Sequence, residues 1–185
     1  MDEPRRAPKQ PTSTQAAGAT ALQDRYAPNS VCFGCGPANP QGLRIKSRVE
    51  GDVVVADWKA AKHHNAFEGF VSGGILGVLF DCHSNWAALH FLMKANGLTK
   101  PPDTVTSHYS VTFLRPTPID RLLHLSSKPI DVQADRATVE TTLEADGKIT
   151  ATSRGLGWSR AGSIPSQECT SLKGIQLCPS PLAKT

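Results

Sequence analysis

The 185 residues of this chain suffice for one domain with its own hydrophobic core and are too few for two large ones. The formal net charge of +4 comes from 20 basic and 16 acidic residues without a polybasic arm, so nucleic acid is not expected as a partner. Five cysteines at irregular spacing, with no signal-peptide core ahead of them, argue against a secreted disulfide framework and favour a reducing compartment.

The two ends of the chain have the composition of segments that lack a packed core. Residues 1–30 contain four prolines and almost no large apolar residue, so we expect a disordered N-terminal tail. Residues 161–185 fill with Ser, Pro, Thr and Gly, which predicts a C-terminal tail. The domain is therefore expected at residues 31–160. We expect a cytoplasmic location, the alternative being a plastid or mitochondrial matrix if residues 1–30 are a transit peptide.

The expected domain opens with a loop at residues 32–43 that Gly and Pro punctuate. Over residues 43–50 apolar and basic side chains alternate, which is the period-2 pattern of a half-buried strand. Gly51 and Asp52 then form a turn, and the β-branched run at residues 53–59 predicts the returning strand.

The opening loop contains a Cys-x-x-Cys motif, Cys32 and Cys35, which is a candidate for a metal or redox site. Structural zinc needs four ligands, and the sequence has no second Cys-x-x-Cys pair and no His-x-x-x-His. Cys82 is isolated in the sequence, while Cys169 and Cys178 fall in the expected tail. We therefore interpret the motif as a turn-forming loop and expect neither a metal nor a cofactor.

Residues 63–86, HHNAFEGFVSGGILGVLFDCHSNW, form the longest apolar run of the chain. Asp81 is its one carboxylate amid Leu, Val and Phe, and an ionised Asp is rarely buried without a partner, so Asp81 is a functional candidate. Because polar residues follow Asp81 at once, the run falls short of the roughly 18 apolar residues of a membrane-spanning helix. We expect a soluble protein.

A helix through this stretch is expected to end at Asn96 and Gly97. Asp146-Gly147 is a strong hairpin turn between two of the strands that follow. Those strands are predicted at residues 104–114, 122–132, 137–145 and 149–158. Two strands, one long helix and an antiparallel meander of four strands make an α+β domain whose sheet wraps around the helix.

The start of the helix has the features of a site for an oxyanion or a carbonyl oxygen. Ser72 stands at the N-cap, and Gly73 and Gly74 let a ligand approach the free N–H groups of the first turn. Asp81 lies eight residues after Gly73, so the two are about 12 Å apart along one helix. A base and an oxyanion donor must both lie near one reacting carbonyl, so one helix cannot supply both.

Two antiparallel copies of this helix, related by a two-fold axis, would bring Gly73 of one chain near Asp81 of the other. A catalytic site would therefore be shared across a dimer. Several small residues lie on the face of Asp81 and are expected to leave a slot for a narrow substrate. They are Gly74, Gly77, Ser84, Asn85 and Ala88.

The segment GFVSGGILGVLFD at residues 69–81 resembles the central-helix motif of the hotdog-fold acyl-CoA thioesterases of the phenylacetate-pathway type. The similarity extends to CFGCGPANPQGL at residues 32–43, FLRPTP at residues 113–118 and DGK at residues 146–148. It covers about residues 31–160, and the motifs are more specific together than any one of them alone.

The resemblance implies a hotdog fold, paired into a homodimer or a homotetramer. It also implies hydrolysis of an acyl-CoA or related acyl thioester to the free acid and the thiol, with acyl-CoA as the small-molecule partner. Asp81 then acts as general base or nucleophile, and the backbone N–H of Gly73 polarises the thioester carbonyl. Asn65 is similar to the asparagine that many relatives carry upstream of the glycines, and the resemblance implies that it is a catalytic residue together with Asp81 and Gly73.

One position departs from the family pattern, since relatives usually have His immediately before the two glycines and this chain has Ser72. We expect Ser72 and Gly74 to contact the substrate, together with an imidazole from His63 or His64 in the preceding loop. Without the usual His, a non-catalytic acyl-thioester-binding protein is the alternative function. A hotdog dehydratase is a further alternative, which the missing His disfavours.

Several basic residues are candidates for binding the phosphates of coenzyme A. They are Arg44, Lys46, Arg48, Lys94, Lys100, Arg115 and Lys128.

Overall fold

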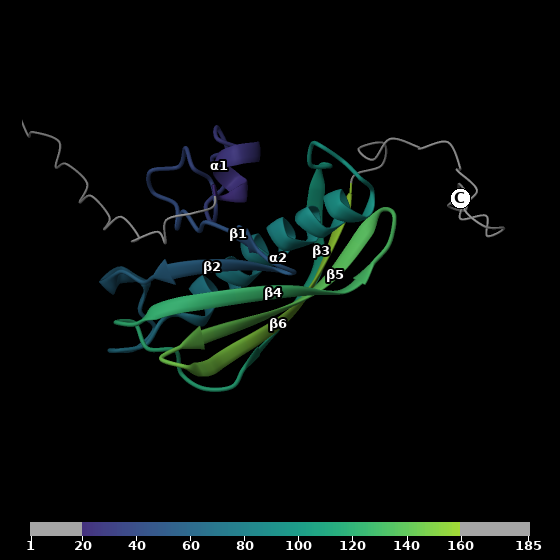
Figure 1. Cartoon of the computed structure of the whole chain (residues 1–185). Coiled ribbons are helices and arrows are strands. Elements are labelled where there is room, and N and C mark those ends of the chain that lie inside the picture. Colours follow the sequence, from purple (N-terminus) through teal and green to yellow (C-terminus); the bar gives the residue numbers. More distant parts are fainter. Residues whose placement is uncertain (1–19, 160–185) are drawn as a thin grey trace, which may run out of the picture.

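The computed structural model describes residues 20–159, in which a curved antiparallel sheet packs around one long helix (Figure 1). The sheet has six strands in the order β1-β2-β4-β5-β6-β3. They are β1 Arg48–Glu50, β2 Val53–Lys59, β3 Thr104–Phe113, β4 Leu122–Val132, β5 Arg136–Ala145 and β6 Lys148–Ser159. The helix α2, Gly73–Ala95, packs against β4, β5 and β6. The expected α+β class, with a sheet wrapped around one helix, is confirmed.

The ends of α2 fall where the sequence places them. Ser72 is the N-cap residue, with extended backbone angles (φ −61°, ψ 134°). At the other end the Asn96 N–H donates to the Leu92 carbonyl at 3.0 Å, and Gly97 takes a positive φ of 63°. A residue with a side chain would be strained there, which is why the helix stops at a glycine.

The core lies between α2 and the concave side of the sheet. Leu79, Phe80 and Leu92 of α2 are fully buried. Leu79 and Phe80 belong to one cluster with Leu123 and Leu125 of β4, and Leu92 belongs to a second cluster with Val139 of β5. Burying a side chain of this size contributes about 1.5–3 kcal/mol to folding.

The expected four-stranded meander is wrong in one respect, the position of β3. Strands β4, β5 and β6 follow one another as predicted, but β3 pairs with β6, where Val111 faces Ser153. No described strand pairs with the other side of β3. The chain therefore crosses over after β3, and β3 becomes an edge strand.

The strand expected at residues 43–50 is shorter than the alternating pattern suggests, since only Arg48–Glu50 forms β1. The Leu43 N–H donates to the Phe33 carbonyl at 2.7 Å, and the Ile45 N–H donates to the Gly34 carbonyl at 3.0 Å. These residues alternate in burial as predicted, but their backbone pairs with the cysteine loop and not with β2.

The folded part begins before residue 31, so the expectation of a disordered tail is wrong for residues 20–30. They contain the short helix α1, Leu22–Tyr26, in which Leu22 and Gln23 are buried. The tail expectation for residues 1–19 and for residues 161–185 falls outside the described residues. Within residues 20–159, no helix combines the length and the apolar composition needed to cross a membrane.

A buried polar network ties α1 to the core. The Gln23 side-chain amide donates to Ser47 Oγ at 3.0 Å, and the Ser47 N–H donates to Gln23 Oε1 at 2.8 Å. Ser47 Oγ lies 2.9 Å from Nδ1 of the fully buried His83, whose Nε2 lies 3.1 Å from the Val54 carbonyl. Burial lowers the pKa of His83 to about 4, so the ring is neutral near pH 7, donates to Val54 and accepts from Ser47.

Candidate active site

A short loop brings several of the predicted site residues to the start of α2. The Ser72 N–H donates to the His64 carbonyl at 2.8 Å, and Asn65 forms a β-bridge with Val71. The Val71 N–H in turn donates to the Thr117 carbonyl at 2.9 Å, which fixes the loop to the segment after β3. His64, Asn65 and Ser72 therefore lie together beside the N-terminus of the helix.

The first turn of α2 offers free backbone donors. The first helical hydrogen bond runs from the Leu76 N–H to the Ser72 carbonyl at 3.1 Å. The N–H groups of Gly73 and Gly74 precede it and have no partner within the helix. Both glycines are exposed, so a ligand can reach these N–H groups at the positive end of the helix dipole.

Asp81 lies on the same helix, two turns further along, and is partly buried. Its carboxylate has no hydrogen-bond or ion-pair partner among the described residues, although it lies close enough to Cys35 to act on that thiol electrostatically. The rise of a helix puts Gly73 and Asp81 about 12 Å apart. A single chain thus contains the two groups without bringing them to one reacting atom.

Strand β3 borders the helix face that carries these residues. A Cβ added to Gly73 would lie 3.4 Å from the ring of Phe113, and one added to Gly77 would lie 3.6 Å from the Tyr109 hydroxyl. Phe113 and Tyr109 both remain exposed, at 54% and 39%. Gly73, Gly77 and Asp81 are four residues apart in succession, so they form one stripe of α2.

The expectation that small helix residues leave a substrate slot is wrong for the later positions. A Cβ added to Gly155 of β6 would lie 3.0 Å from Ser84 Cβ, and one added to Gly157 would lie 2.8 Å from Ala88 Cβ. Ser84 and Ala88 are buried. They serve the close approach of α2 to β6, so these two positions leave no slot for a substrate.

The imidazole of His64 is held by its neighbours. Its ring is buried, lies 5.1 Å from the ring of Trp58 and 4.2 Å from that of His63, and its Nδ1 accepts the Ala61 N–H at 3.0 Å. Burial, with a smaller contribution from the charge of His63, lowers the pKa of His64. Ser72 makes no side-chain capping bond, so its hydroxyl is free of the helix N–H groups.

A cysteine cluster lies beside Asp81, and sequence reasoning missed it. The Sγ atoms of Cys32, Cys35 and Cys82 all lie within 4.8 Å of one another. A hydrogen bond with Cys82 lowers the pKa of the Cys35 thiol and outweighs its burial, with a further contribution from the Trp86 N–H. The same interaction raises the pKa of Cys82. Cys82 looked isolated because it is 50 residues from Cys32 in the sequence.

Most of the basic residues proposed for coenzyme A phosphates are already engaged. Lys94 pairs with Asp52 at 3.2 Å and Lys128 with Glu140 at 2.9 Å. Other pairings are Lys46 with Asp24, Arg48 with Glu50 and Asp57, and Arg44 with the Pro37 carbonyl. Among the described residues, Lys100 and Arg115 are the two of the seven without such a bond, and both are exposed.

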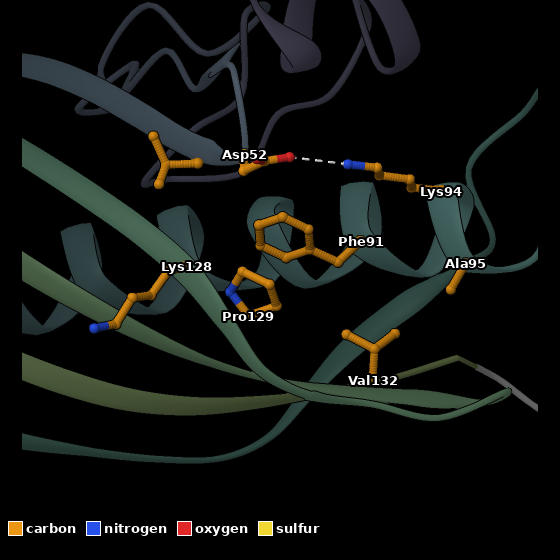
Figure 2. Close-up of a pocket in the computed structure, with 8 residues that line it drawn as sticks. Asp52, Phe91, Lys94, Ala95, Lys128, Pro129 and Val132 are labelled. Carbon is orange, nitrogen blue, oxygen red and sulfur yellow. Dashed lines mark hydrogen bonds and ion pairs between the residues drawn. The ribbon is translucent and has the colours of Figure 1, made fainter.

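An open depression of about 520 Å³ lies near the C-terminal end of α2 (Figure 2). Lys94 and Lys128, two of the basic candidates for coenzyme A, line it, but none of the residues predicted to contact the thioester does. Apolar side chains such as Phe91 and Pro129 line it, and the Lys94–Asp52 ion pair lies at its rim. Its distance along α2 from Gly73 separates it from the candidate active site.

No protein-family model matches the chain, and a search of curated proteins finds no significant match. Solved structures do match. A thioesterase superfamily protein from Shewanella loihica aligns with a TM-score of 0.59 and 26% identity, over 75% of this chain and 99% of its own. The E. coli PaaI protein from the phenylacetic acid degradation operon aligns with a TM-score of 0.54 and 18% identity, over 65% and 82%.

A Streptococcus mutans protein solved with bound acetyl-CoA aligns with a TM-score of 0.52 and 15% identity, over 63% of this chain and 88% of its own. All of these share the antiparallel sheet and central helix described above. The sheet wrapped around α2 is therefore the hotdog fold of the thioesterase superfamily.

Proposed function

We propose that the chain hydrolyses an acyl-CoA or a related acyl thioester to the free acid and the thiol. The observation that carries the proposal is the stripe of α2 in which exposed Gly73 supplies free N–H groups and partly buried Asp81 follows two turns later. The thioesterase-superfamily fold and the bound acetyl-CoA of the Streptococcus mutans neighbour support this substrate class.

A homodimer is proposed to complete the site. Among the described strands, β3 is an edge strand with exposed Val105, Tyr109 and Phe113. The unpaired backbone groups and apolar side chains of such an edge can pair with a strand of a second chain. Phe113 and Tyr109 also contact the helix at Gly73 and Gly77. A partner that adds its own β3 along this edge would therefore approach the stripe, and a two-fold axis would set Gly73 of one protomer against Asp81 of the other.

The proposed chemistry needs few groups. Asp81 takes a proton from a water molecule, whose oxygen attacks the thioester carbonyl carbon. The carbonyl oxygen gains negative charge and accepts a hydrogen bond from the Gly73 N–H of the facing protomer. When the carbon–sulfur bond breaks, the thiolate leaves and is protonated. Asn65 and Ser72 lie beside the same N–H groups and are proposed to position the substrate, with Gly74 as a second donor.

Arg115 and Lys100 are the proposed contacts for the coenzyme A phosphates. Both are exposed and unpaired within residues 20–159. Arg115 belongs to the segment that leads to Thr117, and Thr117 bonds the loop in front of Gly73. His64 is proposed to contribute to substrate binding through the loop it supports, since its ring is buried.

The first test replaces Asp81 by Asn, which removes the base and preserves shape. Wild type and Asp81→Asn are assayed against short, aromatic and long acyl-CoA substrates. Removing a general base is expected to lower kcat about 10²–10⁴-fold. If wild type hydrolyses several substrates and the variant is undiminished, Asp81 is not the base.

A second test asks whether the site is shared. Proline at the first helical position removes the Gly73 N–H and is compatible with the helix start and with the extended Ser72 before it. Gly73→Pro and Asp81→Asn are each expected to be inactive. Refolding or co-expressing them together should restore about a quarter of wild-type activity, because mixed dimers carry one intact site of two. If mixed dimers form and activity is not restored, Gly73 and Asp81 do not act together across two chains.

A non-catalytic acyl-thioester-binding protein is the alternative, and Ser72 in place of the usual His is the observation that favours it. Tight binding of acyl-CoA without hydrolysis across the whole substrate panel would support it. A dehydratase acting on a 3-hydroxyacyl thioester is weaker as a proposal, because the His64 ring is buried away from solvent.

A further inference from the structure

The three-cysteine cluster lies beside Asp81 but has no role in the proposed reaction. Cys32 and Cys35 come from the loop before β1, and Cys82 comes from α2. Two cysteines with two residues between them can bind one metal ion, and a third thiol from a distant element completes a three-sulfur set. Because the three thiols come from two separate elements, the Cys-x-x-Cys motif is not explained by a local turn alone.

The spacing of the sulfurs fits a metal ion. Cys32 Sγ and Cys82 Sγ are 3.8 Å apart. In tetrahedral zinc coordination with Zn–S bonds of about 2.3 Å, neighbouring sulfurs are about 3.8 Å apart. The remaining separations do not exceed 4.8 Å, so movements of under about 1 Å bring all three sulfurs to that geometry.

The loop is shaped to hold its sulfurs at this place. A Cβ at Gly34 would lie 2.3 Å from Cys82 Sγ, so the backbone passes directly over the helix thiol. A Cβ at Gly36 would lie 2.4 Å from the Cys32 N, within a turn that the Gly36 N–H closes on the Cys32 carbonyl at 2.9 Å. Only glycine fits at either position, and both glycines serve the convergence of the three cysteines.

A hydrogen-bond donor supports the cluster from outside. The Trp86 Nε1–H donates to Cys35 Sγ at 3.2 Å. Trp86 lies one helical turn after Cys82, so the same element supplies a ligand and a donor to the neighbouring sulfur. Donors of this kind orient metal-bound thiolates and offset their negative charge.

We propose that Cys32, Cys35 and Cys82 bind a zinc ion through three thiolates. Soft sulfur ligands exclude Mg²⁺ and Ca²⁺ and suit Zn²⁺. Cys35 and Cys82 are buried and Cys32 is exposed, so the fourth coordination position faces solvent and takes a water molecule or an added thiol. The ion fixes the loop of residues 32–43 to α2 beside Asp81, and it stabilises the folded chain by binding only when these elements are assembled.

The test uses the full chain without a histidine tag, purified with a phosphine reductant. Elemental analysis is expected to find about one zinc ion per chain. Replacing zinc by Co²⁺ should produce the near-ultraviolet absorption of thiolate-bound cobalt. Cys32→Ser removes an exposed ligand with little effect on packing, and it should weaken zinc binding more than about tenfold while the circular dichroism spectrum is retained.

The matched control is the double variant Cys169→Ser/Cys178→Ser, which removes the other two cysteines and should keep its zinc. A chelator should lower the unfolding midpoint of wild type and of this control, and leave that of Cys32→Ser unchanged. Zinc retained in Cys32→Ser and lost from the control would overturn the proposal. So would fully reduced wild type that neither retains zinc nor shows the cobalt band.

Discussion

The ring of Phe113 lies over Gly73, the first residue of α2, so that a Cβ on this glycine would lie 3.4 Å from the ring. The contact joins the exposed edge strand β3 to the free N–H groups of the helix. We therefore expect that pairing of a second chain with the β3 edge affects the candidate active site.

The first prediction concerns this edge. Phe113→Asp places a charge on the exposed apolar edge, so we expect a monomer in light scattering and a loss of thioesterase activity of at least about a hundredfold, because half of the shared site is gone. Ile130→Asp is the control, since Ile130 is similarly exposed on β4 and away from β3. A dimeric, active Phe113→Asp protein would show that β3 is not the interface.

The second prediction concerns Gly34. Gly34→Ala places a methyl group 2.3 Å from Cys82 Sγ and 2.8 Å from Val78 Cγ1, so it should lower the free energy of unfolding by about 1–3 kcal/mol in urea denaturation. Gly74→Ala is the comparison, because the nearest atom to its Cβ is 3.7 Å away and a helical Ala is favoured over Gly by about 0.5–1 kcal/mol. If both changes alter the free energy of unfolding equally, Gly34 is not in close contact with Cys82 of the helix.

Much of the fold is readable from local patterns. The end of α2 at Asn96 and Gly97 and the Asp146-Gly147 hairpin depend on residues adjacent in sequence, and both are as predicted. The partner of β3 was not predictable in this way. Alternation reports that a strand has two faces, but it carries no information on which strand lies beside it.

The same limit applies to the sites. Gly73 and Asp81 are close in sequence on one helix, so their separation follows from the helical rise alone. Cys82 joins Cys32 and Cys35 only because the loop before β1 folds back over α2, held by the Leu43 and Ile45 N–H groups. A pattern of residue spacing cannot relate Cys32 to Cys82, which lies 50 residues further along the chain. Likewise, the burial of Ser84 and Ala88 depends on glycines of β6 that face them.

The third prediction concerns the network that anchors α1. Ser47→Ala removes the hydroxyl between Gln23 and His83 and leaves both side chains buried with an unsatisfied group, so we expect a loss of about 1–3 kcal/mol in urea denaturation. Ser126→Ala is a suitable control, because Ser126 is a partly buried serine of β4 outside this network. A Ser47→Ala protein as stable as wild type would show that α1 is not held by these bonds.

The fourth prediction concerns acid stability and Asp57 of β2. Burial raises the pKa of Asp57, but hydrogen bonds from His124 at 2.8 Å and from Arg48 at 2.5 Å outweigh it, so the pKa is lowered on folding. A carboxyl group with a lowered folded pKa stabilises the fold above its unfolded pKa, and this stability is lost as the pH falls through the folded value. The urea concentration at the unfolding midpoint should therefore decrease as the pH is lowered below about 5.

The comparison that isolates this carboxylate is Asp57→Asn, which keeps the shape of the side chain and has no proton to gain. Asp57→Asn should be less stable than wild type at neutral pH, because Arg48 loses its charged partner on β2. The difference between the two proteins should shrink as the pH is lowered, since the protonated carboxyl group of Asp57 and the amide that replaces it are equally uncharged. If the unfolding free energies of the two proteins, plotted against pH, stay parallel from neutral to acid pH, Asp57 has the same pKa in the folded and the unfolded chain.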